Sequence, residues 1–167
     1  MTYTEEFDME KMLELLSKNA RISNAQLAVM LGTTEADVEA RIAEYEKNGV
    51  INGYQALIDW YSIDKEYVIA LIEVKVMPQR DFGFDELASK IMNYSEVDSL
   101  YLMSGGYDLF VTISGRSFKE VAMFVAKRLS TLDGVTSTAT HFVLKKYKDN
   151  GVILHKNDPD ERGNASL

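Results

Sequence analysis

The chain has 167 residues, of which 46% are hydrophobic and 26% charged, and it carries a formal net charge of -8 with no cysteine. This composition is typical of a globular protein with one domain or two small ones, and the absence of cysteine excludes disulfides and thiolate metal sites. The acidic N-terminus lacks the basic and apolar regions of a signal peptide. Because Glu73 and Lys75 interrupt the longest apolar run, we expect no membrane span and a cytoplasmic protein.

The first 53 residues predict three helices. The first is expected over about residues 8–18, with a buried stripe of Met9, Met12, Leu13, Leu15 and Leu16. Ser23 begins the second helix as its N-cap, and Gln26, three residues later, completes a capping box. The apolar face of this helix is expected to hold Ala25, Leu27, Ala28 and Leu31, and Gly32 ends it in the left-handed conformation.

The third helix begins at Thr34, which acts as its N-cap with Asp37 at the capping-box spacing, and it ends at Gly49. Its inward face is expected to hold Val38, Ile42 and Tyr45. Two short helices joined by so tight a turn are typical of a helix-turn-helix, whose second helix enters the major groove of DNA.

Residues 50–59 alternate as an extended segment with an Asn52-Gly53 turn signal, and residues 54–66 are expected to form a linker between two domains. The next segment, 67–77, is a nearly continuous apolar strand that Pro78 ends. A helix over 84–94 follows, with Leu87, Ile91 and Met92 on its buried face.

Two strands, 97–103 and 107–114, are joined by a turn at 104–106. Ser117 begins a further helix with Glu120 closing its capping box, and the inward residues are Val121, Phe124, Val125 and Leu129. A last strand is expected over 135–147. This order predicts a split βαβ, ferredoxin-like domain over 67–148, followed by a loose tail over 149–167.

Two motifs stand in the two halves of the chain. The first comprises Asp8, Leu13 to Leu16, Arg21, Ile22, Ser23, Leu27, Ala28, Leu31, Gly32, Val38, Arg41, Ile42, Glu46, Gly49, Val50, Ile51 and Gly53. The second comprises Gly105 to Leu109 and Thr140 to Lys145. With these motifs in this order, the chain resembles the Lrp/AsnC (feast/famine) family of transcriptional regulators, over roughly residues 7–150. The resemblance implies an α+β protein, with a winged helix-turn-helix domain over 1–53 and a ferredoxin-like βαββαβ (RAM-type) sensing domain.

The same resemblance implies that the partners are double-stranded DNA, a small amino-acid-like effector and further copies of the chain. A homodimer would form through the sensing domains and assemble further into tetramers, octamers or a disc. The apolar strand at 67–77 has more apolar surface than its two helices need, which agrees with a dimer interface. An ordinary core is the alternative explanation for that excess.

The charge of the first domain conflicts with DNA binding, because residues 1–60 carry eleven acidic and five basic side chains. The expected DNA contacts are Asn24, Gln26, Thr33, Thr34, Glu35, Asp37, Glu39, Arg41 and Lys47. An acid can accept a hydrogen bond from cytosine, but Glu35 and Asp37 could instead only stabilise the N-terminus of the third helix. Arg41 could contact a phosphate or pair with an acid of its own domain.

The effector site is expected at the glycine-rich turn. Its amides and Ser104 would receive a carboxylate, and Asp108 would bind an ammonium group. The full candidate set is Ser104, Gly105, Gly106, Tyr107 and Asp108, joined, as the resemblance implies, by Thr138 and Thr140. The alternative is a plain hairpin turn that Asp108 caps.

No catalytic constellation, cofactor site or metal site is expected. His141 and His155 lack ligand spacing, and no nucleophile triad or phosphate loop is present. Two other functions stay open. One is an enzyme of the siroheme decarboxylase type, although the sensing half has only Arg80, Arg116 and Arg128 to bind a carboxylate-rich tetrapyrrole. The other is a metabolite sensor whose DNA module is vestigial.

Overall fold

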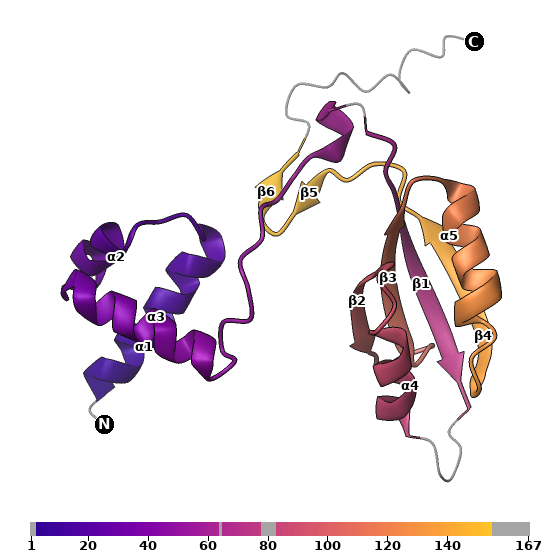
Figure 1. The fold of residues 1–167 in the computed structure, drawn as a ribbon, viewed down its shortest axis with the longest axis horizontal. Coiled ribbons are helices and arrows are strands. Elements are labelled where there is room, and N and C mark those ends of the chain that lie inside the picture. Colours follow the sequence, from indigo (N-terminus) through magenta and orange to yellow (C-terminus); the bar gives the residue numbers. More distant parts are fainter. Residues whose placement is uncertain (1–2, 64, 78–82, 155–167) are drawn as a thin grey trace. The chain divides into compact units, whose positions relative to one another are not determined.

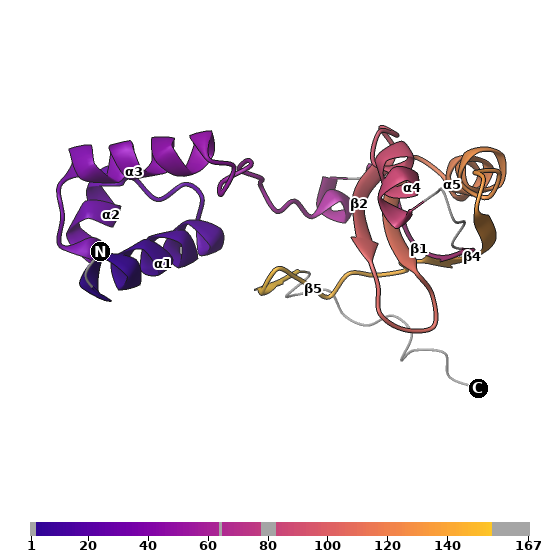
Figure 2. The ribbon, with the colours of Figure 1, turned by 90° about the horizontal axis from the view of Figure 1, so that it is seen from below.

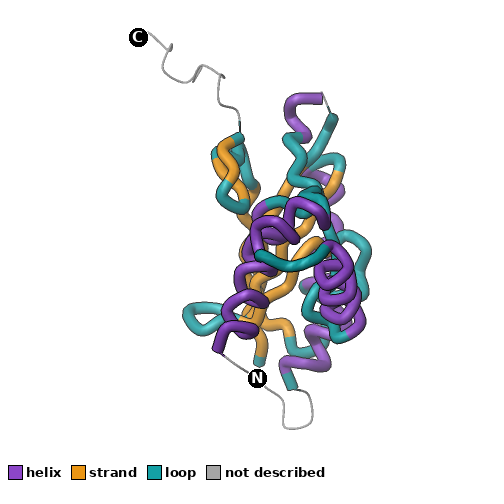
Figure 3. Tube along the Cα trace, turned by 90° about the vertical axis from the view of Figure 1, so that its left-hand side faces the viewer, coloured by secondary structure: helices purple, strands orange, loops and turns teal. Residues whose placement is uncertain are grey.

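The computed structural model describes residues 3–63, 65–77 and 83–154. The chain divides into two compact units, residues 1–57 and 58–167 (Figure 1). All described strands, which Figure 3 colours orange, belong to the second unit. Within the described residues, no helix combines the length and the apolar character that crossing a bilayer requires.

The first unit is built from the helices α1 (Tyr3–Lys18), α2 (Asn24–Leu31) and α3 (Glu35–Lys47) (Figure 2). Its core brings together one fully buried side chain from each helix, Met12, Leu27 and Val38. Leu16 and Ala28 complete the cluster. The predicted three-helix arrangement is confirmed, and α1 begins five residues before the expected start at Asp8.

Both capping boxes predicted for the first unit are present. In α2, the Ser23 Oγ accepts from the Gln26 amide at 3.2 Å, and the Gln26 Oε1 accepts from the Ser23 amide at 3.1 Å. Gly32 ends α2 with φ 67°, and its amide donates to the Ala28 carbonyl. These local bonds satisfy the backbone groups that every short helix leaves unpaired at its ends.

Two expectations for the first unit are wrong. Ala25 is exposed, because it lies off the stripe that Leu27, Ala28 and Leu31 form. The segment 50–59, expected to be extended throughout, begins with a bend at 50–51 and contains no β-strand. Its start folds back on α3 instead, where the Val50 and Ile51 amides both donate to the Tyr45 carbonyl.

The second unit contains a four-stranded antiparallel sheet with strand order β2-β3-β1-β4. Its strands are β1 (Val68–Val76), β2 (Val97–Leu102), β3 (Leu109–Gly115) and β4 (Val135–Phe142). Helix α4 (Phe84–Ile91) joins β1 to β2, and α5 (Phe118–Phe124) with the π-helical turn η2 (Val125–Leu129) joins β3 to β4. A short 3-10 turn, η1 (Trp60–Ile63), precedes the sheet. The predicted βαββαβ order is confirmed.

Both helices cover the same face of the sheet (Figure 2). Successive side chains of a strand alternate between its faces, and Ala70, Ile72 and Val74 of β1 are fully buried beneath the helices. The helices contribute the residues that the sequence predicts as inward, namely Leu87, Ile91, Val121, Phe124, Val125 and Leu129. The other face, here called the open face, carries Glu73, Lys75 and His141, which are half-buried or exposed.

Four further expectations, all for the second unit, are wrong, and the first three concern α4, α5 and β4. Met92 is 58% exposed and lies beyond the end of α4, so it does not join the core. The Glu120 Oε2 accepts from the Arg116 amide at 2.7 Å and not from that of Ser117. Strand β4 ends at Phe142, five residues before the expected end. Pro78, expected to end β1, lies outside the described residues.

The fourth correction concerns the expected tail. Strands β5 (Lys148–Asp149) and β6 (Val152–Ile153) pair as a small hairpin. Its two turn residues, Asn150 and Gly151, both have positive φ, 42° and 83°. Asn-Gly is the strongest short-range hairpin signal in a sequence, and it identifies this turn in retrospect.

Replacing Gly32 by alanine tests the left-handed cap of α2. A Cβ at this position meets no atom within 4 Å, so the backbone conformation alone should lower the free energy of unfolding, by about 1–2 kcal/mol. Gly53→Ala is the matched control, since its Cβ is equally unobstructed and its φ lies outside the left-handed region. Equal changes for both variants in urea unfolding would contradict this explanation.

Candidate DNA-binding helix and effector hairpin

Asp37 organises the N-terminus of α3. Its Oδ2 accepts from the Thr34 Oγ at 2.6 Å and from the Thr33 Oγ at 3.0 Å, and the Asp37 amide donates to the Thr34 Oγ at 3.2 Å. The hydrogen bonds from Thr34, and then that from Thr33, hold the pKa of the Asp37 carboxyl below its usual value. This carboxylate therefore stabilises the N-terminus of α3, which is the structural alternative expected for Asp37.

Arg41 lies one turn further along α3 and is half-buried. Its positive charge contributes to the lowered pKa of Asp37 and opposes the rise that burial causes in the pKa of Tyr45. Arg41 thus interacts electrostatically with its own helix, while Glu35 and Glu39 are exposed beside it.

The other expected DNA contacts are spread over the unit. The Gln26 side chain belongs to the α2 capping box, and Asn24 is half-buried at the start of that helix. Lys47 is exposed in the last turn of α3, about 18 Å along the axis from Glu35 at 1.5 Å per residue. The structure therefore brings Thr33, Thr34, Asp37 and Arg41 together but leaves Lys47 apart from them.

Two features of this unit have no clear signal in the sequence. Val29 is 84% exposed on α2, although it is apolar, because it falls off the buried stripe. Tyr54 attaches the segment after α3 to that helix, since its hydroxyl donates to the Glu46 Oε1 at 3.0 Å. Burial and the neighbouring Glu46 raise the pKa of Tyr54. The eight-residue separation of Tyr54 and Glu46 matches no periodic pattern.

The glycine-rich turn connects β2 to β3, and Ser104, Gly105 and Gly106 are exposed at its tip. At its base, the Met103 amide donates to the Asp108 carbonyl at 2.8 Å, and the Asp108 amide donates to the Val74 carbonyl at 3.0 Å. A Cβ added to either glycine meets no atom within 4 Å. The turn is therefore open to solvent at its tip and fixed to β1 at its base.

The Asp108 carboxylate bonds to the backbone of the central strand. Its Oδ2 accepts from the Val76 amide at 2.7 Å, where the register of β1 against β4 shifts between Lys75 and Val76. Tyr107 packs on Phe110 with ring centroids 5.9 Å apart. Asp108 thus caps an irregularity in β1, and its carboxylate can accept further hydrogen bonds.

Thr138 and Thr140 lie on the opposite side of β1 from the turn. Thr138 pairs with Val74 and Thr140 with Ile72, so both threonines share the helix-covered face. Because Asp108 also bonds to Val74, Asp108 and Thr138 flank the same residue at one end of the sheet, about two strand spacings or 10 Å apart.

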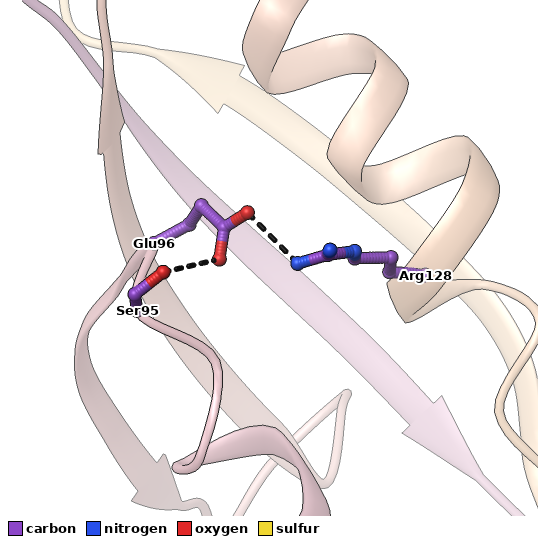
Figure 4. A network of polar contacts seen from close by, with 3 residues as sticks. All are labelled: Ser95, Glu96 and Arg128. Carbon is purple, nitrogen blue, oxygen red and sulfur yellow. Dashed lines mark hydrogen bonds and ion pairs between the residues drawn. The ribbon is translucent and has the colours of Figure 1, made fainter.

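Two polar clusters lie outside the expected sites. On the open face, the His141 Nε2 lies 3.4 Å from the Glu73 Oε1. At the end of η2, the Arg128 Nη1 donates to the Glu96 Oε1 at 2.9 Å, and the Ser95 Oγ donates to the Glu96 Oε2 at 3.1 Å (Figure 4). Arg128 therefore joins η2 to the start of β2. It is one of the three arginines of the sensing half that could bind a tetrapyrrole, and it is already paired with Glu96.

The pH dependence of stability tests the Asp37 cap. Because the pKa of Asp37 is lower in the folded chain, the stabilisation is present above the pKa of the unfolded chain and is lost as the pH falls through the folded value. Asp37→Asn should lower the melting temperature at pH 7 and make little difference near pH 2. Glu39→Gln, two residues along the same helix, is the control, and a pH-independent loss in Asp37→Asn would contradict the cap.

Two family models match the chain in the expected order. The winged helix-turn-helix DNA-binding model matches residues 10–52, and the Lrp/AsnC ligand binding domain model matches residues 69–153. Together they cover both compact units. The chain is 48% identical over 153 residues to YugG, an uncharacterised HTH-type transcriptional regulator of Bacillus subtilis strain 168, covering 91% of this chain and 92% of that protein.

More distant relatives have names that specify a ligand or response. The chain is 27% identical over 146 residues to the leucine-responsive regulatory protein of Haemophilus influenzae, covering 87% of each. The fold is similar to that of the transcriptional regulator NMB0573 from Neisseria meningitidis, solved as its L-Met complex. That similarity has a TM-score of 0.69 at 24% identity and covers 94% of this chain and 97% of the other.

Proposed function

Because the chain belongs to the Lrp/AsnC family of helix-turn-helix transcriptional regulators, we propose that an amino acid or a related small metabolite, bound at the turn 104–108, controls its assembly or its affinity for DNA. The observation that carries this proposal is Asp108, a charged side chain anchored to the central strand beside an exposed glycine-rich turn. We further propose that the protein acts in the cytoplasm. Relatives of the chain are named as transcriptional regulators, which argues against the enzymatic alternative.

The chemistry of the turn supports a zwitterionic effector. Gly105 and Gly106 are exposed residues, and their backbone amides are the proposed donors for an α-carboxylate. The Asp108 carboxylate accepts one hydrogen bond from Val76 and has capacity left for an ammonium group. The names of the two relatives refer to leucine and to L-Met, so these two amino acids are the first effectors to test.

Assembly of several chains into one oligomer would compensate for the weak DNA binding of a single acidic module. The exposed part of α3 carries Glu35 and Glu39 beside the Asp37 cap, so a single module should bind DNA weakly. Two modules on one assembly bind the same DNA with a high effective concentration. We propose a homodimer that forms through the open face and assembles further into larger oligomers. By strand register and alternation, Leu71, Phe110 and Tyr101 share this face with Glu73, and each is half-buried or exposed, so they supply apolar contact area.

The main rival is a metabolite sensor whose DNA module is vestigial, and the acidic surface of α3 favours it. Both functions predict effector binding at the turn. They differ in DNA binding, because only the regulator binds its own upstream DNA more tightly than random DNA.

Replacing Asp108 by asparagine tests the effector site. Asparagine retains an acceptor for the Val76 amide but removes the charge, so a change in the response to L-leucine or L-methionine by about tenfold or more in effector concentration is expected, at unchanged basal DNA binding. Asp133→Asn, an exposed acid of the same unit, is the control. An unchanged effector response in Asp108→Asn would refute the site.

Replacing Glu35 by lysine tests whether α3 faces DNA. The variant should bind random DNA more tightly, and the slope of log K against log salt should steepen by about 0.9 for each additional phosphate that the protein neutralises. Glu10→Lys on α1 makes the same change of charge on another helix. Equal effects of the two variants in fluorescence anisotropy would mean that α3 is not the DNA-facing helix.

A further inference from the structure

Strand β4 contains one residue that has no partner in β1. Ser137 pairs with Lys75 in the regular register. The next pair joins Val135 to Val76, so Thr136 is the extra residue of a β-bulge. Bulges often lie beside functional sites, where they redirect a side chain. This bulge lies at the end of β1 to which the proposed effector turn is bonded.

The hydroxyl of Thr136 is bonded to β1. Its Oγ1 donates to the Lys75 carbonyl at 3.1 Å. This carbonyl and the amide of Val76 belong to the same peptide group, and the Val76 amide donates to the Asp108 Oδ2 at 2.7 Å. A chain of two hydrogen bonds, here called the relay, therefore runs from β4, through one peptide group of β1, to the carboxylate beside the effector turn.

The peptide group couples the two hydrogen bonds of the relay. Because the group is planar, a donor that fixes the direction of the carbonyl also fixes the direction of the amide N–H. A hydrogen bond accepted by the carbonyl also polarises the amide and makes it a stronger donor. Loss of the Thr136 hydroxyl should therefore weaken the bond from Val76 to Asp108 and loosen the carboxylate.

The second carboxylate oxygen of Asp108 has capacity for a ligand. Asp108 is half-buried, and within the described part of the chain its Oδ1 has no hydrogen-bond donor. A carboxylate that a backbone amide holds in place presents its other oxygen in a fixed direction. An ammonium group then binds without first having to order the side chain.

We propose that Thr136 is a positioning residue of the effector site, and that its hydroxyl acts through the relay to orient the Asp108 carboxylate toward the ammonium group of the amino acid. This inference rests on the proposed effector site at the turn 104–108 and adds to it a residue on the far side of β1. Thr136 differs from Thr138 and Thr140, which lie in the regular register of β4.

Replacing Thr136 by valine tests the role of the hydroxyl, because valine keeps the shape of the side chain and cannot donate. The measurement is calorimetry of the full chain with L-leucine and with L-methionine. Thr136→Val should weaken the binding of the amino acid by about two- to tenfold, the usual net contribution of one hydrogen bond. Unchanged affinity in a folded Thr136→Val variant would overturn the proposal.

Two matched variants control for the change at Thr136. Thr136→Ser retains the donor and should bind the amino acid like the wild type. Ser137→Ala removes the hydroxyl of the neighbouring exposed residue and should also leave the affinity unchanged. If Ser137→Ala weakened binding as much as Thr136→Val, the effect would belong to the strand end in general, and the relay would be refuted.

A double-mutant cycle with Asp108→Asn separates positioning from a general effect on the fold. If Thr136 acts through the charge of Asp108, Thr136→Val should cause little further loss of affinity in the Asp108→Asn background. Equal losses in the two backgrounds would show that Thr136 acts independently of Asp108 and would contradict the proposal.

Amide hydrogen exchange tests the relay without any effector. The Val76 amide should exchange about two- to tenfold faster in Thr136→Val than in the wild type or in Thr136→Ser. An unchanged exchange rate at Val76 would refute the relay. If the rate rose as expected but the wild type bound neither amino acid, the relay would be present, and the effector role proposed for the turn and for Thr136 would be refuted.

Discussion

The pairing of β1 with β3 on one side and β4 on the other determines where the residues of the proposed effector site lie. The register places Thr138 beside Val74 on the β4 side, and the Asp108 amide bonds to the Val74 carbonyl on the β3 side. Burial of Ala70, Ile72 and Val74 beneath the helices holds this strand in place. A one-residue slip of β1 would turn these side chains to the open face. The proposed site therefore depends on the core of the second unit.

The acidic side chains of the first unit limit how tightly a single copy of it can bind DNA. Only some of the acidic side chains of α3 have a structural role. Asp37 caps the helix, while Glu35 and Glu39 are exposed on it. A regulator with such a module needs either favourable base contacts or several modules on one DNA. Repulsion between these acids and the phosphates lowers the affinity of a single module for DNA.

The sequence predicts best those features whose cause is local. The capping boxes at Ser23 and Thr34, the left-handed Gly32 and the inward residues of α5 all follow from short-range spacing, and the structure confirms them. Prediction from the sequence fails where tertiary contacts determine the local conformation. The segment 50–59 has a strand-like pattern but no partner strand in the described chain, and β4 ends early because its pairing with β1 ends at Phe142. The hydrogen bond from Val76 to Asp108 joins residues 32 positions apart, so no local pattern predicts it.

Binding to the DNA upstream of its own gene tests the central claim most directly. The measurement is fluorescence anisotropy of the purified full chain at low and at physiological salt, with random DNA as competitor and with and without L-leucine or L-methionine. A regulator should show saturable binding that outcompetes random DNA and shifts when its effector is added. Absence of DNA binding at both salt concentrations, with effector binding retained, would contradict this account and leave a metabolite sensor with a vestigial DNA module.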